Sequence, residues 1–158
     1  MISFRRFSVW LALGLAICAT NPAHALELKK YNAKQFKQLA DQPAFNRGRL
    51  VGLMSGCSFY EHANAAGKHW RRVTTTQTEW QGDQVHIGKA NFPADADGRI
   101  SSVKCDWEPR KEECGALVFT GSNQTGNSTY ILGSSGIVNL TGAYNDALAS
   151  ATIICDLD

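Results

Sequence analysis

The sequence predicts an all-β domain, built as a closed antiparallel barrel of about eight strands and preceded by one short helix. From Arg49 onward the chain is rich in Thr, Val, Ile, Ser and aromatic residues, and Gly, Asn or Asp interrupts it about every 8–15 residues, which is typical of short strands joined by turns. The segments at the two ends of this region alternate apolar and polar residues, and each carries a cysteine on its apolar face. A two-layer β-sandwich fits the same observations and remains the alternative.

Residues 1–25 have the pattern of a signal peptide. Two arginines precede an apolar stretch at 9–19 that is too short to cross a bilayer of about 30 Å, and Ala23-His24-Ala25 supplies the small residues of a cleavage site. We therefore expect a bacterial Sec-type signal that is removed near Ala25. The product should be periplasmic or secreted, with no stable membrane insertion after cleavage.

Residues 26–48 are predicted to form an N-terminal segment with a short helix, ahead of a disulfide-stabilised β-domain at 49–158. Asn32 is a suitable helix N-cap, Phe36 and Ala40 follow at helical spacing, and Pro43 ends the pattern. The helix should therefore run from about Asn32 to the residue before Pro43.

The β-domain divides into eight predicted strands, at 49–60, 69–80, 84–90, 99–107, 115–120, 128–133, 137–143 and 150–157. Cys57 shares the apolar face of the first strand with Val51 and Leu53, and Cys155 shares that of the last strand with Ile153. When an up-and-down sheet closes on itself, its first and last strands become neighbours. Closure would therefore bring Cys57 and Cys155 together on the core side.

Four cysteines follow the predicted signal peptide: Cys57, Cys105, Cys114 and Cys155. An even number in an exported chain indicates two disulfides, whereas a zinc site usually needs a tight Cys or His pair that this spacing lacks. The residues between Cys105 and Cys114 are polar and turn-like, so we expect Cys105 to pair with Cys114 and Cys57 with Cys155.

Charge excludes two classes of partner. The chain has 16 Lys and Arg against 14 Asp and Glu, and the signal peptide holds two of the arginines and no acid. The mature chain is therefore neutral, and it lacks the basic surface that binding to nucleic acid or to an anionic membrane requires.

The sequence contains no clear catalytic or metal-binding constellation, and it indicates no cofactor. Trp70 and Arg72 share one face of a predicted strand and, with Trp80, are our candidate ligand-binding residues. A thiol–imidazole pair of Cys57 with His62 or His69 is an alternative, but an exported cysteine of an even set is expected to be in a disulfide.

Residues 95–98, Asp-Ala-Asp-Gly, resemble the start of a calcium-binding loop. The later ligands and the closing glutamate of such a loop are missing, so a turn is the preferred interpretation.

A longer stretch, residues 97–136, resembles small exported bacterial proteins with an allene oxide cyclase-like, or dirigent-like, β-barrel. The resemblance lies in Asp97-Gly98, Phe119-Thr120-Gly121, and the segment from Thr125-Gly126 through Tyr130 to Gly133 and Gly136. Asn127 and Thr129 stand where that family usually has glycines. The resemblance implies the barrel and carries over no catalytic residue.

Taken together, these observations favour an exported, non-enzymatic β-barrel protein that binds an unknown small ligand or an envelope or host protein. The alternative is an isomerase- or cyclase-type enzyme that uses a hydrophobic barrel pocket.

Overall fold

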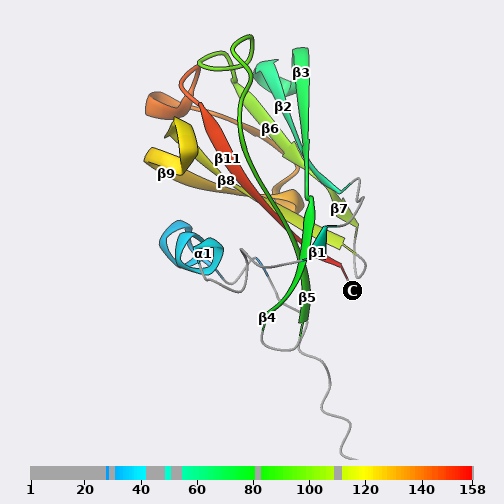
Figure 1. Cartoon of the computed structure of the whole chain (residues 1–158). Coiled ribbons are helices and arrows are strands. Elements are labelled where there is room, and N and C mark those ends of the chain that lie inside the picture. The colour runs from blue at the N-terminus through cyan, green and yellow to red at the C-terminus, as the bar shows by residue number, and fades with distance from the viewer. Residues whose placement is uncertain are drawn as a thin grey trace, which may run out of the picture.

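The computed structural model describes residues 28, 31–41, 49–50, 55–80, 83–108 and 112–157. The predicted signal peptide, residues 1–25, lies outside these ranges. The described chain forms two antiparallel β-sheets and one short α-helix (Figure 1). No helix among the described residues is long and apolar enough to cross a membrane.

The smaller sheet has four strands in the order β10-β6-β2-β3. Their bounds are Gly56–His62 for β2, Ala66–Val73 for β3, Ser102–Cys105 for β6 and Ile137–Asn139 for β10.

The larger sheet has the order β1-β4-β5-β11-β8-β7, and β9 also pairs with β8. Its strands are β1 (Arg49–Leu50), β4 (Thr76–Trp80), β5 (Asp83–Asn91), β7 (Trp107–Glu108), β8 (Glu112–Gly121), β9 (Thr125–Leu132) and β11 (Ser150–Leu157). Four 3₁₀ turns complete the described chain: η3 (Ala63–Ala65), η4 (Ser122–Gln124), η5 (Gly133–Ser135) and η6 (Gly142–Tyr144).

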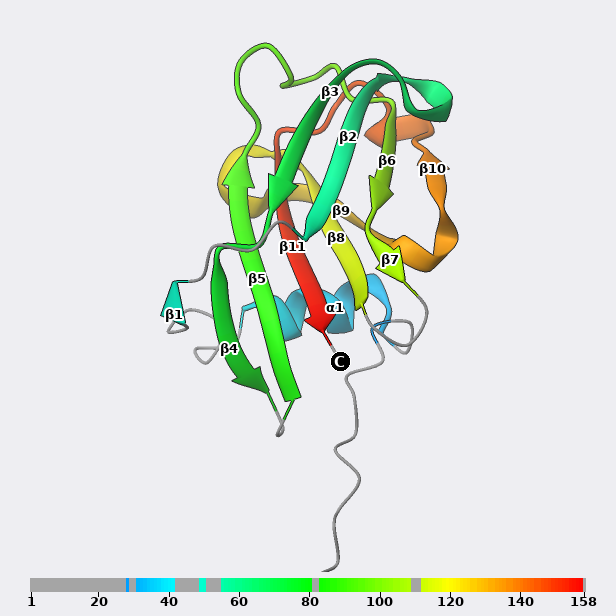
Figure 2. The same cartoon turned by 90° about the vertical axis from the view of Figure 1, so that its right-hand side faces the viewer.

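Because the strands divide between two sheets, the predicted closed barrel is wrong and the two-layer sandwich is confirmed. Figure 2 shows the smaller sheet in front of the larger one. The predicted strands 49–60 and 69–80 each contain two strands that belong to different sheets. The prediction that the first and last strands are adjacent is also wrong, since β11 pairs with β5 on one side and with β8 on the other.

The main core fills the space between the sheets. Alternate residues of each strand point inward, so that Phe59 and Val103 of the smaller sheet share one buried cluster with Ala116, Val118 and Ile153 of the larger sheet. The ring centroids of Phe59 and Phe92 lie 4.7 Å apart within this cluster. The inner faces of both sheets are therefore occupied by packed side chains.

The helix α1, Ala33–Ala40, covers the outer face of the larger sheet. The backbone N–H of Gln35 donates to Asn32 Oδ1 at 3.0 Å and that of Asn32 donates to Gln35 Oε1 at 3.1 Å, a reciprocal cap that confirms the predicted N-cap. Phe36 is fully buried against this face, and the hydroxyl of Tyr130 donates to the carbonyl of Leu28 at 3.1 Å. The described part of the N-terminal segment, residues 28 and 31–41, is thus packed onto the β-domain.

The four cysteines form two disulfides, as predicted, but with a different pairing. Cys57 bonds to Cys105 and Cys114 bonds to Cys155. Each bond joins directly opposite residues of neighbouring strands, β2 with β6 and β11 with β8. Cys105 and Cys114 lie in different sheets, so the predicted bridges Cys105–Cys114 and Cys57–Cys155 are wrong.

The two halves of the chain have the same topology. Strands β2, β3, β5 and β6 correspond in order to β8, β9, β10 and β11, and the third strand of each half is placed in the sheet of the other half. Asn139 at the end of β10 accepts from the backbone N–H of Asn64 at 2.7 Å, and Asn91 at the end of β5 accepts from that of Asn123 at 2.7 Å. The sandwich therefore has approximate internal twofold symmetry.

Candidate functional site

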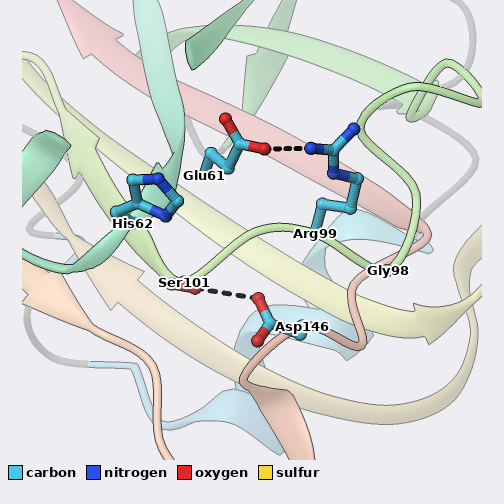
Figure 3. Close-up of a pocket in the computed structure, with 6 residues that line it drawn as sticks. All are labelled: Glu61, His62, Gly98, Arg99, Ser101 and Asp146. Atoms are coloured by element: carbon cyan, nitrogen blue, oxygen red, sulfur yellow. Dashed lines mark hydrogen bonds and ion pairs between the residues drawn. The ribbon is translucent and has the colours of Figure 1, made fainter. Parts of the chain in front are cut away.

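A polar pocket of about 340 Å³ lies at the end of the sandwich away from the disulfides. Its lining residues, which we call the loop-end pocket, are Glu61, His62, Gly98, Arg99, Ser101 and Asp146 (Figure 3). They come from the end of β2, the loop before β6 and the loop before β11, so the pocket joins the two halves of the chain.

Two crossing loops fix the backbone of the pocket. The N–H of Gly98 donates to the carbonyl of Leu148 at 3.2 Å, and the N–H of Asp146 donates to the carbonyl of Ile100 at 3.0 Å. Gly98 and Asp146 occupy equivalent places, and both have positive φ, 69° and 52°. Glycine adopts this conformation freely, whereas a residue with a side chain is held there by its surroundings. The crossing therefore determines where the Asp146 side chain lies.

The carboxylate of Asp146 accepts hydrogen bonds from neutral groups. Ser101 Oγ donates to Asp146 Oδ1 at 2.8 Å, and Asn145 Nδ2 donates to Asp146 Oδ2 at 2.8 Å. These bonds orient the carboxylate and leave its negative charge uncompensated by either partner.

The second carboxylate of the pocket is held in an ion pair. Glu61 Oε1 accepts from Arg99 Nη2 (Figure 3). Glu61 Oε2 accepts from the backbone N–H of Lys68 at 3.4 Å. The Glu61 side chain is 19% exposed, whereas the Arg99 side chain is 56% exposed. The glutamate is thus the fixed member of the pair, and the arginine is the solvent-exposed one.

The internal symmetry supplies a comparison within the chain. In both halves a serine at the start of a strand donates to the carbonyl at the end of a hairpin strand: Ser102 to His62, and Ser150 to Gly121, each at 2.6 Å. The backbone is therefore the same in the two places, but the second half has Ala149 where the first has Ser101. Gly98 likewise stands where the second half has Asp146. At these two pairs of positions, only the place formed by Ser101 and Asp146 carries oxygen-bearing side chains, and Thr120 stands where the first half has Glu61.

The residues proposed from the sequence as ligand-binding lie away from this pocket. Trp70 is buried in the main core, and its indole N–H donates to Asp95 Oδ2 at 3.3 Å. The Arg72 guanidinium carbon lies 5.7 Å from the ring centroid of Phe92, and Arg72 Nη1 donates to the carbonyl of Arg71 at 2.9 Å. Trp80 is in β4 of the other sheet, and its side chain lies outside what is described. Trp70 and Trp80 are therefore on different sheets.

The sequence analysis did not predict the loop-end pocket, although the sequence contains a repeat that points to it. Asn91 and Asn139 are 48 residues apart, as are Ser102 and Ser150, while Asn64 and Asn123 are 59 apart, as are Gly67 and Gly126. These constant separations mark the repeat, and the repeat aligns the two loops that cross at the pocket.

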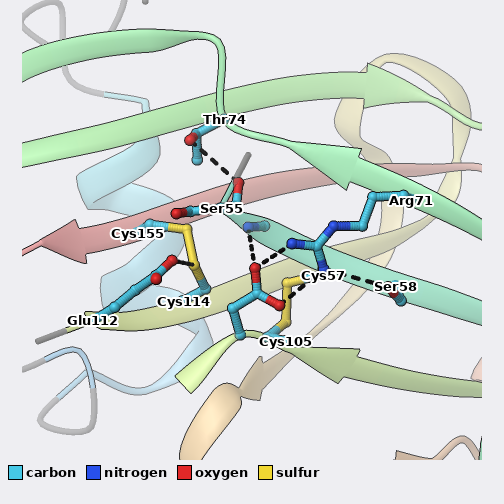
Figure 4. Close-up of a disulfide and its surroundings, with 11 residues drawn as sticks. Ser55, Cys57, Ser58, Arg71, Thr74, Cys105, Glu112, Cys114 and Cys155 are labelled. Atoms are coloured by element: carbon cyan, nitrogen blue, oxygen red, sulfur yellow. Dashed lines mark hydrogen bonds and ion pairs between the residues drawn. A yellow bond between two sulfur atoms is a disulfide. The ribbon is translucent and has the colours of Figure 1, made fainter. Parts of the chain in front are cut away.

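The opposite end of the sandwich is a structural site. The two disulfides lie there, beside an ion pair in which Arg71 binds both carboxylate oxygens of Asp106 (Figure 4). Asp106 Oδ2 also accepts from the backbone N–H of Gly56 at 2.9 Å. Cys57, Cys114 and Cys155 are fully buried and oxidised, which removes them as nucleophiles and excludes Cys114 and Cys155 as metal ligands beside Glu112.

One buried titratable group lies between the sheets. His86 is 5% exposed and pairs across the ladder with Cys155. Within the described chain its Nδ1 is buried without a hydrogen-bond partner. Desolvation lowers the pKa of this imidazole below its ordinary value of 6.5.

Among known proteins, two solved structures are similar to this chain. No family model and no curated protein matches the chain. The N-terminal domain of protein S is similar with 14% identity and a TM-score of 0.42, over 63% of this chain and 94% of that one. A structure described as "Evolution of the eye lens beta-gamma-crystallin domain fold" is similar with 18% identity and a TM-score of 0.42, over 71% of this chain and 98% of that one. Neither bears on function at this level of similarity, and neither is an allene oxide cyclase-like barrel.

Proposed function

We propose that this protein is an exported, non-enzymatic binding module whose loop-end pocket binds a small divalent cation, with Asp146 as the central ligand. The observation that carries the proposal is the Asp146 carboxylate, which hydrogen bonds from Ser101 and Asn145 hold in position without neutralising its charge. The two disulfides support export, because such bonds persist in oxidising compartments.

The donor atoms of the pocket suit a hard cation. Glu61 at the end of β2 and Asp146 in the loop before β11 offer carboxylate oxygens, and Ser101 in the loop before β6 offers a hydroxyl oxygen. Oxygen ligands in an irregular arrangement are typical of Ca²⁺, whereas Mg²⁺ requires near-octahedral geometry. We therefore expect Ca²⁺ to bind more tightly than Mg²⁺, with water completing the coordination.

The polar character of the pocket favours binding over the alternative of an isomerase. An enzyme that works by shaping a hydrophobic pocket needs apolar walls around its substrate. The loop-end pocket is lined by charged and hydroxyl groups, and the apolar residues of both inner faces are packed into the core.

Thermal unfolding of the exported form with and without CaCl₂ tests the proposal. Saturation at about 100 times the dissociation constant stabilises a protein by about 2.7 kcal/mol, which for a domain of this size raises the Tm by roughly 10 °C. Asp146→Asn should abolish the rise, because it removes the charge and keeps the shape. Asp41→Asn removes an equal charge on the exposed end of α1 and should leave the rise intact.

The proposal is overturned if neither CaCl₂ nor MgCl₂ raises the Tm of the wild-type protein. It is also overturned if Asp146→Asn responds to CaCl₂ as fully as Asp41→Asn does.

A further inference from the structure

The ion pair between Arg99 and Glu61 places a positive charge inside the pocket that is proposed to take a cation. We propose that Arg99 is a displaceable internal competitor, whose guanidinium must release Glu61 before a divalent cation can occupy the pocket. This inference rests on the proposed function and adds the residue that controls affinity and selectivity.

The backbone of Arg99 is held in place, whereas its guanidinium is exposed and can move. The backbone N–H of Arg99 donates to the carbonyl of Ala96 at 3.0 Å, and the next residue, Ile100, is fully buried. The Arg99 side chain is 56% exposed, so its guanidinium can turn into solvent without disturbing the loop. Displacement therefore requires only rotation of the side chain.

Release of the pair costs little, because ion pairs with an exposed member contribute little to stability. Glu61 stays in place when the arginine leaves, since its other oxygen accepts from the backbone N–H of Lys68. The pocket would then present the Glu61 and Asp146 carboxylates together with Ser101 Oγ.

The competitor also sets selectivity. A monovalent cation would replace one positive charge at Glu61 with another and gain little. A divalent cation brings two charges to two carboxylates and can compensate for the lost ion pair. The wild-type pocket should therefore favour divalent over monovalent cations, and it should bind them more weakly than the carboxylates alone would.

Isothermal titration with CaCl₂ tests the role of Arg99. Arg99→Gln removes the charge and should tighten binding on the order of tenfold, because it removes both the competitor and its repulsion of the incoming cation. Arg99→Lys keeps the charge and should bind close to the wild-type affinity. Lys37→Gln removes an equal charge on α1 and should also bind like the wild type.

The outcomes separate this inference from the proposed function. If Arg99→Gln binds Ca²⁺ no more tightly than the wild type while Asp146→Asn loses binding, Arg99 is not a competitor and the cation site stands. If no variant and no wild-type sample binds Ca²⁺, the proposed function fails and this inference fails with it. If circular dichroism shows that Arg99→Gln is unfolded, Arg99→Met, which keeps the aliphatic stem, replaces it. Its Ca²⁺ affinity is then compared with that of the wild type in the same way.

Discussion

Replacing both cysteines of one disulfide with alanine should lower the free energy of unfolding by about 4 kcal/mol, whichever disulfide is removed. The estimate comes from loop closure in the unfolded chain, which depends on the separation of the bridged residues. The separations are 48 residues for Cys57–Cys105 and 41 for Cys114–Cys155, so the two bridges constrain the unfolded chain almost equally.

The pairing expected from the sequence gives a different result. Cys105 and Cys114 are nine residues apart and Cys57 and Cys155 are 98 apart. Those loops would contribute about 2.7 and about 4.7 kcal/mol, a difference that equilibrium urea unfolding resolves. The double variants Cys57→Ala/Cys105→Ala and Cys114→Ala/Cys155→Ala should therefore each lose about 4 kcal/mol if the pairing in the structure holds. Under the pairing expected from the sequence each variant would break both bridges and lose about 7 kcal/mol, and losses of that size would contradict the pairing in the structure.

Tryptic mapping of the unreduced protein provides a second, independent readout. Cleavage after lysine and arginine places Cys57 in the peptide 50–68 and Cys105 in 105–110, while Cys114 and Cys155 share the peptide 112–158. The pairing in the structure should give 50–68 linked to 105–110, and 112–158 separate with an internal bridge. Each of the other two pairings links all three peptides into one species, and recovery of that species would refute the reasoning.

Two further predictions concern the interior. Because burial lowers the pKa of His86 from 6.5, the unfolded state takes up the proton first as the pH falls through 6.5, and the free energy of unfolding should fall there. Urea unfolding over this pH range should show a flatter profile for His86→Gln than for His69→Gln at an exposed position, and parallel profiles would exclude His86 as the cause. Phe36→Ala should cost about 3–5 kcal/mol by removing a fully buried ring of α1, whereas Trp107→Ala, at a 51% exposed position, should cost far less. Similar losses for the two would show that α1 contributes little to the fold.

The sequence predicts local features of this fold better than long-range ones. The cap at Asn32 depends on residues three positions apart, and the buried face of β2 follows from simple alternation, so both were predicted correctly. In β11 alternation identified the face toward the main core, with Ile153 and Cys155, but the opposite face, with Ile154, is buried as well. Alternation shows which side of a strand is buried, but it does not show which strands are neighbours. The barrel closure and the cysteine pairing both required that second kind of knowledge, and both were wrong.

The pocket was missed for a related reason. Glu61, Ser101 and Asp146 are ordinary polar residues of strand ends and loops when each is read in its own segment. They become a site only because the loops before β6 and β11 cross, and that crossing follows from the repeat. The segment 95–98 was correctly assigned to a turn, yet Gly98 at its end belongs to the pocket through its contact with the second half of the chain.

The placement of β5 and β10 in each other's sheets affects how the chain can fold while it is being synthesised. The smaller sheet is completed by residues 137–139, and the larger sheet needs β11 at 150–157 between β5 and β8. A ribosome that has synthesised only the first half has therefore released no segment that can form a complete sheet. Neither sheet can be completed until almost all of the chain has emerged, and a protein cut between β7 and β8 would yield two fragments that each lack a strand of their own sheet.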